Sequence, residues 1–401
     1  MGSQNNSLKS AFPKPIYLAA AVRSPIGKFG GTLKGFSAPE LAALSLTECK
    51  RRSGVTNEPD MILLGHARQA GTGPNPARQI VFGAGLPESV PAMTINQACA
   101  SGLTSIMLAA EKIALGRAHS IFAGGVESMS NTPYFLSQSR WGQKMGNTEV
   151  VDGMYKDGFL CPMSQMVMGE TVEKFLAQEL GISRAEQDQY ALQSQKRADH
   201  AWRTSAFLDE TFDIKIKQKG GDAKLYREDE HRRGDCTLEM LTKLAPVFDM
   251  KTGTVTAGNS SGITDGSAFV HVTDEKTSSV MAEILDFETI ALDPRKMGLG
   301  PVPATQKLLA RQGLTVQDLD AVELNEAFAA QVIACQRALK IPEEKLNMRG
   351  GAIALGHPIG CTGTRIAVTL MHILKGKTGA LGLATLCVSG GHGVAMLFRM
   401  T

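Results

Sequence analysis

Residues 96–102 read NQACASG, a loop of small residues between a strand-like run and a helical pattern. A second strand-like run, residues 121–123, comes after the helix and ends at a Gly-Gly pair. The helix is indicated by apolar residues that recur every three or four positions: Leu103, Ile106, Met107, Ala110 and Ile113. Strands that alternate with amphipathic helices are typical of an α/β fold.

The last third of the chain repeats this layout. Residues 366–374 carry a second apolar helical stripe, and the strand-like run 380–386 leads to a second Gly-Gly pair. The interval from Asp60 to the Ser-Gly pair that opens the first helix nearly equals the interval from Asp320 to a Thr-Gly pair in the second. We therefore predict two related α/β halves, each with a Gly-rich loop before a helix and a strand that ends in Gly-Gly.

A different kind of segment lies between the two halves. It has Met-rich stretches, a polar helical pattern over 184–203 and a turn at 258–262 that returns the chain to the first half. We predict an inserted loop domain. The predicted boundaries are 1–128 with 264–284 for the N-terminal half, 129–263 for the inserted domain and 285–401 for the C-terminal half.

The composition excludes several classes of protein. Of 401 residues, 43% are hydrophobic and 20% charged, which suits a globular chain of two or three domains. The net charge of +3, without blocks of like charge, argues against a nucleic-acid partner. No apolar run reaches the length of a membrane span, so no membrane partner is expected.

The cysteines point to a reducing compartment. Their number is odd, their spacing is wide and no CxxC motif occurs, which argues against a disulfide framework and against a metal site. We therefore expect a cytoplasmic protein with reduced thiols. Five of the seven are interpreted as buried structural residues: Cys49, Cys161, Cys236, Cys335 and Cys361.

The other two cysteines stand in loops suited to chemistry. Cys99 precedes a helix, where the helix dipole and free N–H groups are expected to stabilise a nucleophilic thiolate. Cys387 ends a strand before a glycine hairpin, residues 388–393. Two further candidates are His357, a base within the Gly-rich loop 350–360, and Asn325, just past a strand end.

Together and in this order, these four segments resemble the thiolase family, over residues 16–400. Residues 23–27 (RSPIG), 124–130 (GGVESMS) and 253–262 are also similar to family motifs. The resemblance implies a five-layered α-β-α-β-α fold of duplicated halves. It also implies an acyl-CoA acyltransferase that reversibly condenses two acyl-CoA molecules or cleaves 3-ketoacyl-CoA with CoA, short acyl chains being favoured.

The resemblance also implies a role for each site residue. Cys99 would carry the acyl group, His357 would activate it, and Cys387 would move the α-proton. Asn325 would position a water that forms an oxyanion hole with His357, and the N–H groups of Cys99 and Ser389 would form a second hole.

The same resemblance implies a ligand and a quaternary structure. Coenzyme A or acyl-CoA enters as a substrate, and no permanently bound cofactor or metal is expected. A similarity of residues 139–158 to a tetramerisation loop implies a homo-oligomer, a dimer or a tetramer. The residues expected to contact the substrate or CoA are Arg233, with Arg232 as its one-residue alternative, Ser261, Ala257, Phe248, Met168, Met297 and Phe328.

Two departures from the family pattern leave questions open. Val167 stands where the biosynthetic members have His, which puts strict acetoacetyl-CoA specificity in doubt. Ser389 replaces a glycine, so that its side chain limits φ and is expected to shift the second oxyanion hole.

Four other functions fit the sequence less well. Other condensing enzymes of this fold do not share both the motif of residues 325–328 (NEAF) and a second catalytic Cys. A catalytically weak acyl-CoA- or lipid-binding protein is favoured only by Ser389. A cysteine protease would not explain Cys387. A dinucleotide-binding dehydrogenase would need a GxGxxG motif after the first strand.

Overall fold

The computed structural model describes residues 8, 10–217 and 221–401. Residues 1–7 and 9 of the predicted N-terminal half, and 218–220 of the predicted inserted domain, lie outside the described residues. A ten-stranded mixed sheet forms the frame, and its main path runs β14-β15-β16-β13-β1-β12-β5-β3-β4. In path order these strands are Ala321–Leu324, Leu381–Val388, His392–Met400, Val280–Ala291, Tyr17–Arg23, Thr264–Thr273, Ser120–Ser128, Met61–His66 and Ala92–Ile95, with β2 (Gly27–Lys28) beside β12.

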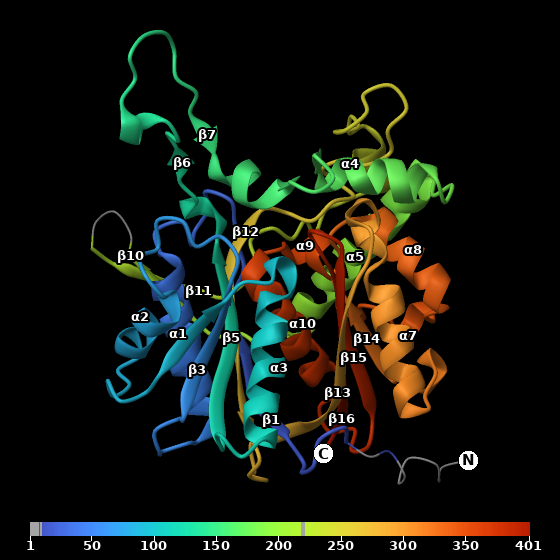
Figure 1. Cartoon of the computed structure of the whole chain (residues 1–401). Coiled ribbons are helices and arrows are strands. Elements are labelled where there is room, and N and C mark those ends of the chain that lie inside the picture. The colour runs from blue at the N-terminus through green and yellow to red at the C-terminus, as the bar shows by residue number, and fades with distance from the viewer. Residues whose placement is uncertain (1–7, 9, 218–220) are drawn as a thin grey trace.

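The sheet has two halves, with helices between them and on the outer side of each, and this arrangement makes five layers (Figure 1). Helix α1 (Ala38–Ser53) packs on β1, β5 and β12, and α2 (Pro76–Gly83) packs beside it. Helices α3 (Ser101–Ala114) and α10 (Ile359–Ile373) fill the centre between the two halves of the sheet. Helix α7 (Pro301–Gln312) covers β13 and β16 on the far side. The predicted five-layered α/β fold is confirmed.

The two halves of the sheet are continuous because β1 pairs with strands of both. It runs antiparallel to β12 along most of its length, and residues 17–19 also pair with β13. Among the named strands that the structure describes, parallel pairing occurs between β3 and its neighbours β4 and β5, and between β14 and β15. Each half therefore has parallel strands whose carboxyl ends point to one end of the layers.

The central helices are apolar on all sides because sheet covers them from both directions. Every residue of α10 from Ile359 to His372 is buried. The helices meet backbone to backbone at Gly102, where a Cβ would lie 2.6 Å from Thr364 Oγ1 and 2.8 Å from the carbonyl oxygen of Gly360. Any larger side chain at Gly102 would separate the two helices that carry the loops of the site.

The predicted likeness of the two Gly-Gly pairs is wrong in detail. Gly124 and Gly125 lie inside β5 rather than after it. Glycine is required at Gly125 because a Cβ there would lie 2.2 Å from the carbonyl oxygen of Gly360. The pair therefore marks a close contact between β5 and the start of α10, and the strand does not end there. Gly390 and Gly391 form the turn between β15 and β16, with φ of +89° and +84°.

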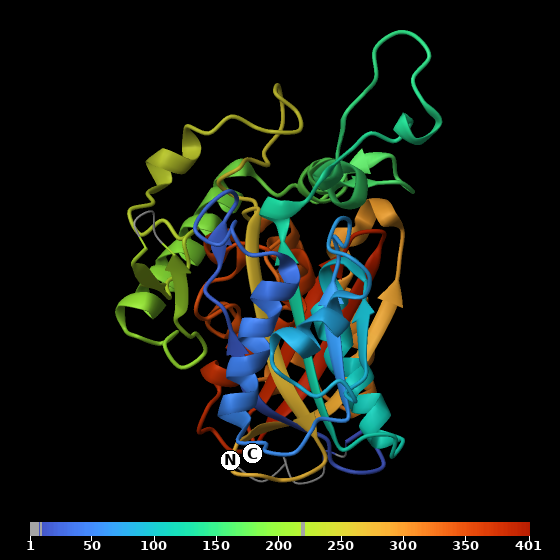
Figure 2. The same cartoon turned by 90° about the vertical axis from the view of Figure 1, so that its left-hand side faces the viewer.

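Much of the segment between β5 and β12 lies at the end of the layers to which these parallel strands point, whereas residues 214–217 and 223–226 pack beside α1 (Figures 1 and 2). The hairpin β6–β7 (Tyr134–Phe135, Val151–Asp152) projects as a long arm, and α5 (Arg184–Arg203) is the helix predicted over 184–203. The remaining elements that complete the description are α4 (Met168–Val172), α6 (Leu238–Thr242), α8 (Ala329–Leu339), α9 (Ala352–Leu355), β8 (Leu160–Cys161), β9 (Met166–Val167), β10 (Ile214–Lys217) and β11 (Ala223–Tyr226).

One buried carboxylate joins this segment to the C-terminal half. Glu326 accepts hydrogen bonds from Tyr190 Oη (2.8 Å) and Ser194 Oγ (2.7 Å) of α5, and from the Ile353 N–H (3.1 Å). The contact fixes α5 above the loop that contains His357. In the part of the chain that the structure describes, no helix is both long enough and apolar enough to cross a membrane.

Candidate functional site

Side chains that can act as nucleophiles or form hydrogen bonds to a ligand gather at the carboxyl ends of the parallel strands, where ligands bind in open α/β sheets. Arg68 follows β3, and Asn96 follows β4. Asn325 follows β14, and Cys387 is the penultimate residue of β15. Both halves of the chain therefore bring residues to one place.

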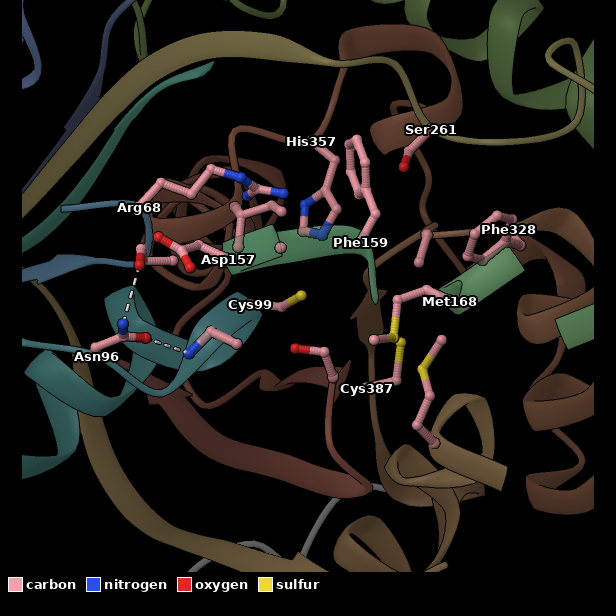
Figure 3. Close-up of a pocket in the computed structure, with 17 residues that line it drawn as sticks. Arg68, Asn96, Cys99, Asp157, Phe159, Met168, Ser261, Phe328, His357 and Cys387 are labelled. Carbon is pink, nitrogen blue, oxygen red and sulfur yellow. Dashed lines mark hydrogen bonds between the residues drawn. The ribbon is translucent and has the colours of Figure 1, made fainter. Parts of the chain in front are cut away.

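A cavity of about 120 Å³ lies there (Figure 3). It is lined by Cys99, His357, Cys387 and Ser389, so the structure brings together four of the five predicted catalytic residues. Of the seven predicted substrate contacts, Ser261, Met168, Met297 and Phe328 also line it.

Cys99 lies on a short 3₁₀ turn, Ala98–Ala100, directly before α3. The Ser101 hydroxyl holds this turn by accepting from the Gln97 N–H (2.9 Å) and donating to the Ala98 carbonyl (2.7 Å). Ala98 has a φ of +46°, a left-handed conformation that lifts the turn out of helical geometry. The turn places the Cys99 sulfur at the cavity (Figure 3).

The predicted resting thiolate at Cys99 is not what its surroundings favour. Burial raises the pKa of the Cys99 thiol and outweighs the opposing effects of the Ser389 N–H, the Arg68 charge and the Cys99 N–H. The thiol is therefore protonated at neutral pH and needs a base in order to react.

His357 has the tautomer of such a base. Its Nδ1 lies 2.6 Å from Thr362 Oγ1, and that hydroxyl donates its single proton to the Pro358 carbonyl (3.0 Å). The hydroxyl must accept from Nδ1–H, which leaves a lone pair on Nε2, and Nε2 has no protein partner. Burial, assisted by the charges of Arg365 and Arg68, lowers the pKa of His357 to about 3, so the ring is neutral near pH 7.

Cys387 and Ser389 face Cys99 from the opposite half. Burial and the charge of Cys99 raise the pKa of the Cys387 thiol well above its usual value. Ser389 is not among the residues with positive φ, and its N–H acts to lower the pKa of the Cys99 thiol. The positions that need glycine are the next two, Gly390 and Gly391, so the Ser389 side chain causes no strain in φ.

Asn325 is the predicted catalytic residue that the cavity does not include. It is fully buried, its N–H donates to the Thr385 carbonyl (3.0 Å), and both polar atoms of its side chain have no protein partner. Two residues that come soon after Asn325 in the chain, Ala327 and Phe328, do line the cavity. Phe328 forms a β-bridge with Ser260, and the Ala327 carbonyl accepts from the Ser261 N–H (3.0 Å).

Arg233, Ala257 and Phe248 also lie outside the cavity lining. Phe248 packs on Gly169, next to Met168, where a Cβ would lie 1.9 Å from the ring. Arg232 is held in ion pairs with Asp199 and Glu228, whereas Arg233 is exposed.

The sequence-based predictions missed Arg68, which lines the cavity, and Glu127 and His66, which do not line it but hold its loops. Glu127 accepts from the N–H groups of Ala67, Arg68 and Gly360 and pairs with His66 (3.1 Å), so it ties both His66 and the His357 loop to the first half. Burial raises the pKa of Glu127, but His66, Arg68 and these donors bring it below its usual value. Arg68 could have been predicted as a site residue, because it follows a parallel strand. No sequence pattern reveals the contacts of Glu127.

Comparison with known proteins gives a consistent result. The family model described as Thiolase, N-terminal domain matches residues 16–276, and that described as Thiolase, C-terminal domain matches residues 278–400. The chain is 44% identical over 387 residues to an acetyl-CoA acetyltransferase of Cupriavidus necator, covering 95% of this chain and 98% of the relative. It is 44% identical over 386 residues to a probable acetyl-CoA acyltransferase of Staphylococcus aureus, with the same coverage.

Two solved structures share the fold over nearly the whole chain. The Bacillus anthracis acetyl-CoA acetyltransferase superposes with a TM-score of 0.93 at 41% identity, covering 99% of this chain and 100% of that one. The human mitochondrial 3-ketoacyl-CoA thiolase superposes with a TM-score of 0.93 at 38% identity, covering 98% and 100%.

Proposed function

This chain belongs to the thiolase family, and from that premise we propose that it forms and cleaves 3-ketoacyl-CoA through an acyl thioester on Cys99. It is an enzyme of the acyltransferase class that acts on CoA thioesters. The observation that carries the residue assignment is the convergence of two thiols and one neutral imidazole on a single cavity.

Acylation begins when His357 Nε2 takes the proton of the Cys99 thiol. The sulfur attacks the carbonyl carbon of acyl-CoA, the bond to the CoA sulfur breaks, and His357 returns the proton to the leaving thiolate. Backbone N–H groups of Cys99 and Ser389 stabilise the oxyanion of the tetrahedral intermediate. This role is supported by the effect of both N–H groups on Cys99, because both act to lower the pKa of its thiol.

Carbon–carbon chemistry uses the second thiol. In cleavage, Cys387 donates its proton to the carbanion that leaves as acyl-CoA; in condensation, its thiolate removes the α-proton of the second acyl-CoA. Burial raises the pKa of Cys387, and a charge on Cys99 would raise it further, so Cys387 loses its proton more easily while Cys99 is acylated than while it is a thiolate. We assign Asn325 to hold a water that stabilises the enolate with His357, a role supported by its buried, unpartnered carboxamide.

CoA enters past Ser261, with its nucleotide end toward Arg233. This path is supported by a chain of neighbours from Ser261 to Arg233. Gly262 lies against the ring of His231, and the charge of Arg233 helps to lower the pKa of that ring. Ala257, exposed in the same turn, and Phe248, behind Met168, complete the proposed contacts.

We further propose the three-part division predicted above, a homo-oligomeric state and a cytoplasmic location. The projecting arm supports an oligomer, because Trp141 and Met145 are 82% and 94% exposed on it. Seven free cysteines support a reducing compartment. A cavity of about 120 Å³ supports short acyl chains.

Thiolysis of a panel of 3-ketoacyl-CoAs tests the function. We expect CoA-dependent cleavage that is fastest for acetoacetyl-CoA and other short chains, and a mass increase of one acetyl group after incubation with acetyl-CoA. A protein that binds acyl-CoA but neither cleaves it nor gains the acetyl group would contradict the proposal and favour the binding protein.

His357→Ala is expected to slow acylation at pH 7 by roughly 10²- to 10⁴-fold, because the Cys99 thiol loses its base. Since the pKa of Cys99 is raised, more thiolate forms as pH increases, and the rate in the variant should rise about tenfold per pH unit toward that pKa. Wild-type acylation should change far less near neutral pH, because His357, with a pKa of about 3, stays neutral there.

Rapid-quench measurement of the acetyl adduct between pH 6 and 9 checks this expectation. The matched control is His372→Ala, which removes a buried imidazole of α10 outside the cavity lining. Parallel pH profiles for wild type and His357→Ala would refute the role.

A further inference from the structure

A buried cation without an anionic partner lies in the cavity wall. Arg68 is 4% exposed, and its Nε and Nη2 make no hydrogen bond to residues 8, 10–217 or 221–401. No ion pair joins it to any residue that the structure describes. Leaving a buried guanidinium unpaired is costly, so a partner supplied by a ligand would stabilise it.

The nearby carboxylates do not satisfy its side chain. Glu127 spends both oxygens on other donors, among them the backbone N–H of Arg68 itself. Asp157 also lines the cavity, but it is exposed and not within ion-pairing distance. Both charges act on Arg68 only from a distance, and neither supplies an acceptor for Nε or Nη2.

The guanidinium is held in place rather than free to leave. It stacks on Phe159 with 5.0 Å between Cζ and the ring centroid. A Cβ on Gly158 would lie 1.9 Å from Nη2, so the chain is kept small where the guanidinium passes. In Figure 3 the group points toward His357 and the centre of the cavity. A guanidinium fixed in this way needs little reordering to bind a carboxylate.

The position of Cys99 gives the direction of a bound acyl chain. Figure 3 shows Ser261 and Phe328 toward one end of the cavity, Arg68 and Asn96 toward the other, and Cys99 between them. With CoA passing Ser261, the acyl group on Cys99 extends toward Arg68.

We propose that the enzyme acts on short 3-ketoacyl-CoA substrates whose acyl chain ends in a carboxylate, and that Arg68 binds that carboxylate. This inference rests on the proposed thiolase function and specifies its substrate class. In cleavage, the Cys99 sulfur attacks C3, the C2–C3 bond breaks, and C2 takes the Cys387 proton and leaves as acetyl-CoA. The ω-carboxyacyl group stays on Cys99 beside Arg68 until the CoA thiol accepts it.

Matched substrate pairs test the proposal. Each pair has the same chain length and ends either in a carboxylate or in a methyl group, as 3-oxoadipyl-CoA and 3-oxohexanoyl-CoA do. For at least one pair, the kcat/KM of thiolysis should favour the carboxylate by roughly 10- to 100-fold, the effect of a charge-assisted hydrogen bond.

Arg68→Met should reverse that ratio, because it keeps the length of the side chain and removes the charge. Arg78→Met is the control, since Arg78 also stacks on a phenylalanine, Phe82 (4.8 Å), but lies outside the cavity lining. It should preserve the wild-type ratio. As a ratio within one protein, the measurement is insensitive to partial loss of folded enzyme, and Arg68→Lys, which keeps the charge, should retain part of the preference.

The outcomes separate this inference from the proposed function. Wild-type enzyme that cleaves methyl-ended substrates but discriminates against carboxylates of every length would overturn the role of Arg68 and leave the thiolase assignment intact. Equal losses on both members of each pair in Arg68→Met would also overturn it, because Arg68 would then act on Cys99 and not on substrate. Failure to cleave any member would contradict the function itself.

Discussion

Cys99→Ala is expected to abolish the acyl-enzyme and to reduce both condensation and thiolysis by roughly 10⁴-fold or more, as loss of a covalent nucleophile does in other enzymes. The other thiol of the cavity, Cys387, has a different role in the proposed mechanism, and burial raises its pKa well above its usual value. Mass spectrometry after incubation with acetyl-CoA, with thiolysis rates measured in parallel, checks the expectation.

Cys361→Ala is the matched control for this variant. Cys361 is a buried thiol in the central core, one of the five predicted structural cysteines, and it does not line the cavity. The adduct and the rates should persist in Cys361→Ala. An acetyl adduct of undiminished amount in Cys99→Ala would show that the nucleophile is another residue.

Cys387→Ala is expected to separate the two half-reactions. Acylation of Cys99 needs His357 and the backbone N–H groups, none of which this change removes. Cleavage and formation of the carbon–carbon bond need a proton moved at the α-carbon and should fall roughly 10²- to 10⁴-fold. The variant should therefore gain the acetyl group near the wild-type rate, while acetoacetyl-CoA thiolysis is nearly lost.

Cys335→Ala provides the control for Cys387→Ala. Both cysteines belong to the same apolar core cluster, but Cys335 does not line the cavity. Thiolysis should survive in Cys335→Ala, apart from any loss of folded protein. Full thiolysis in Cys387→Ala would mean that water or another residue moves the proton, and the role assigned to this thiol would be wrong.

Much of the fold could be predicted because local patterns repeat in the chain. The apolar spacing of residues 103–113 and 366–374 predicts α3 and α10, and the run 380–386 predicts β15. What the pattern could not show is that β1 joins both half-sheets, since strand pairing depends on partners far away in the chain. Dependence on distant partners also explains the error at Gly124-Gly125. A glycine pair can mark the end of a strand or a close contact inside one, and the sequence does not distinguish the two.

For the site, the sequence by itself determined which residue types are available and in what order: two cysteines before glycine-rich turns, one histidine in a glycine loop, and an asparagine after a strand. Only the tertiary structure decided their protonation and their neighbours. Burial keeps Cys99 protonated and His357 neutral, Thr362 sets the histidine tautomer, and Arg68 enters the cavity wall. Desolvation and hydrogen bonding are properties of three-dimensional surroundings, and no linear pattern carries them.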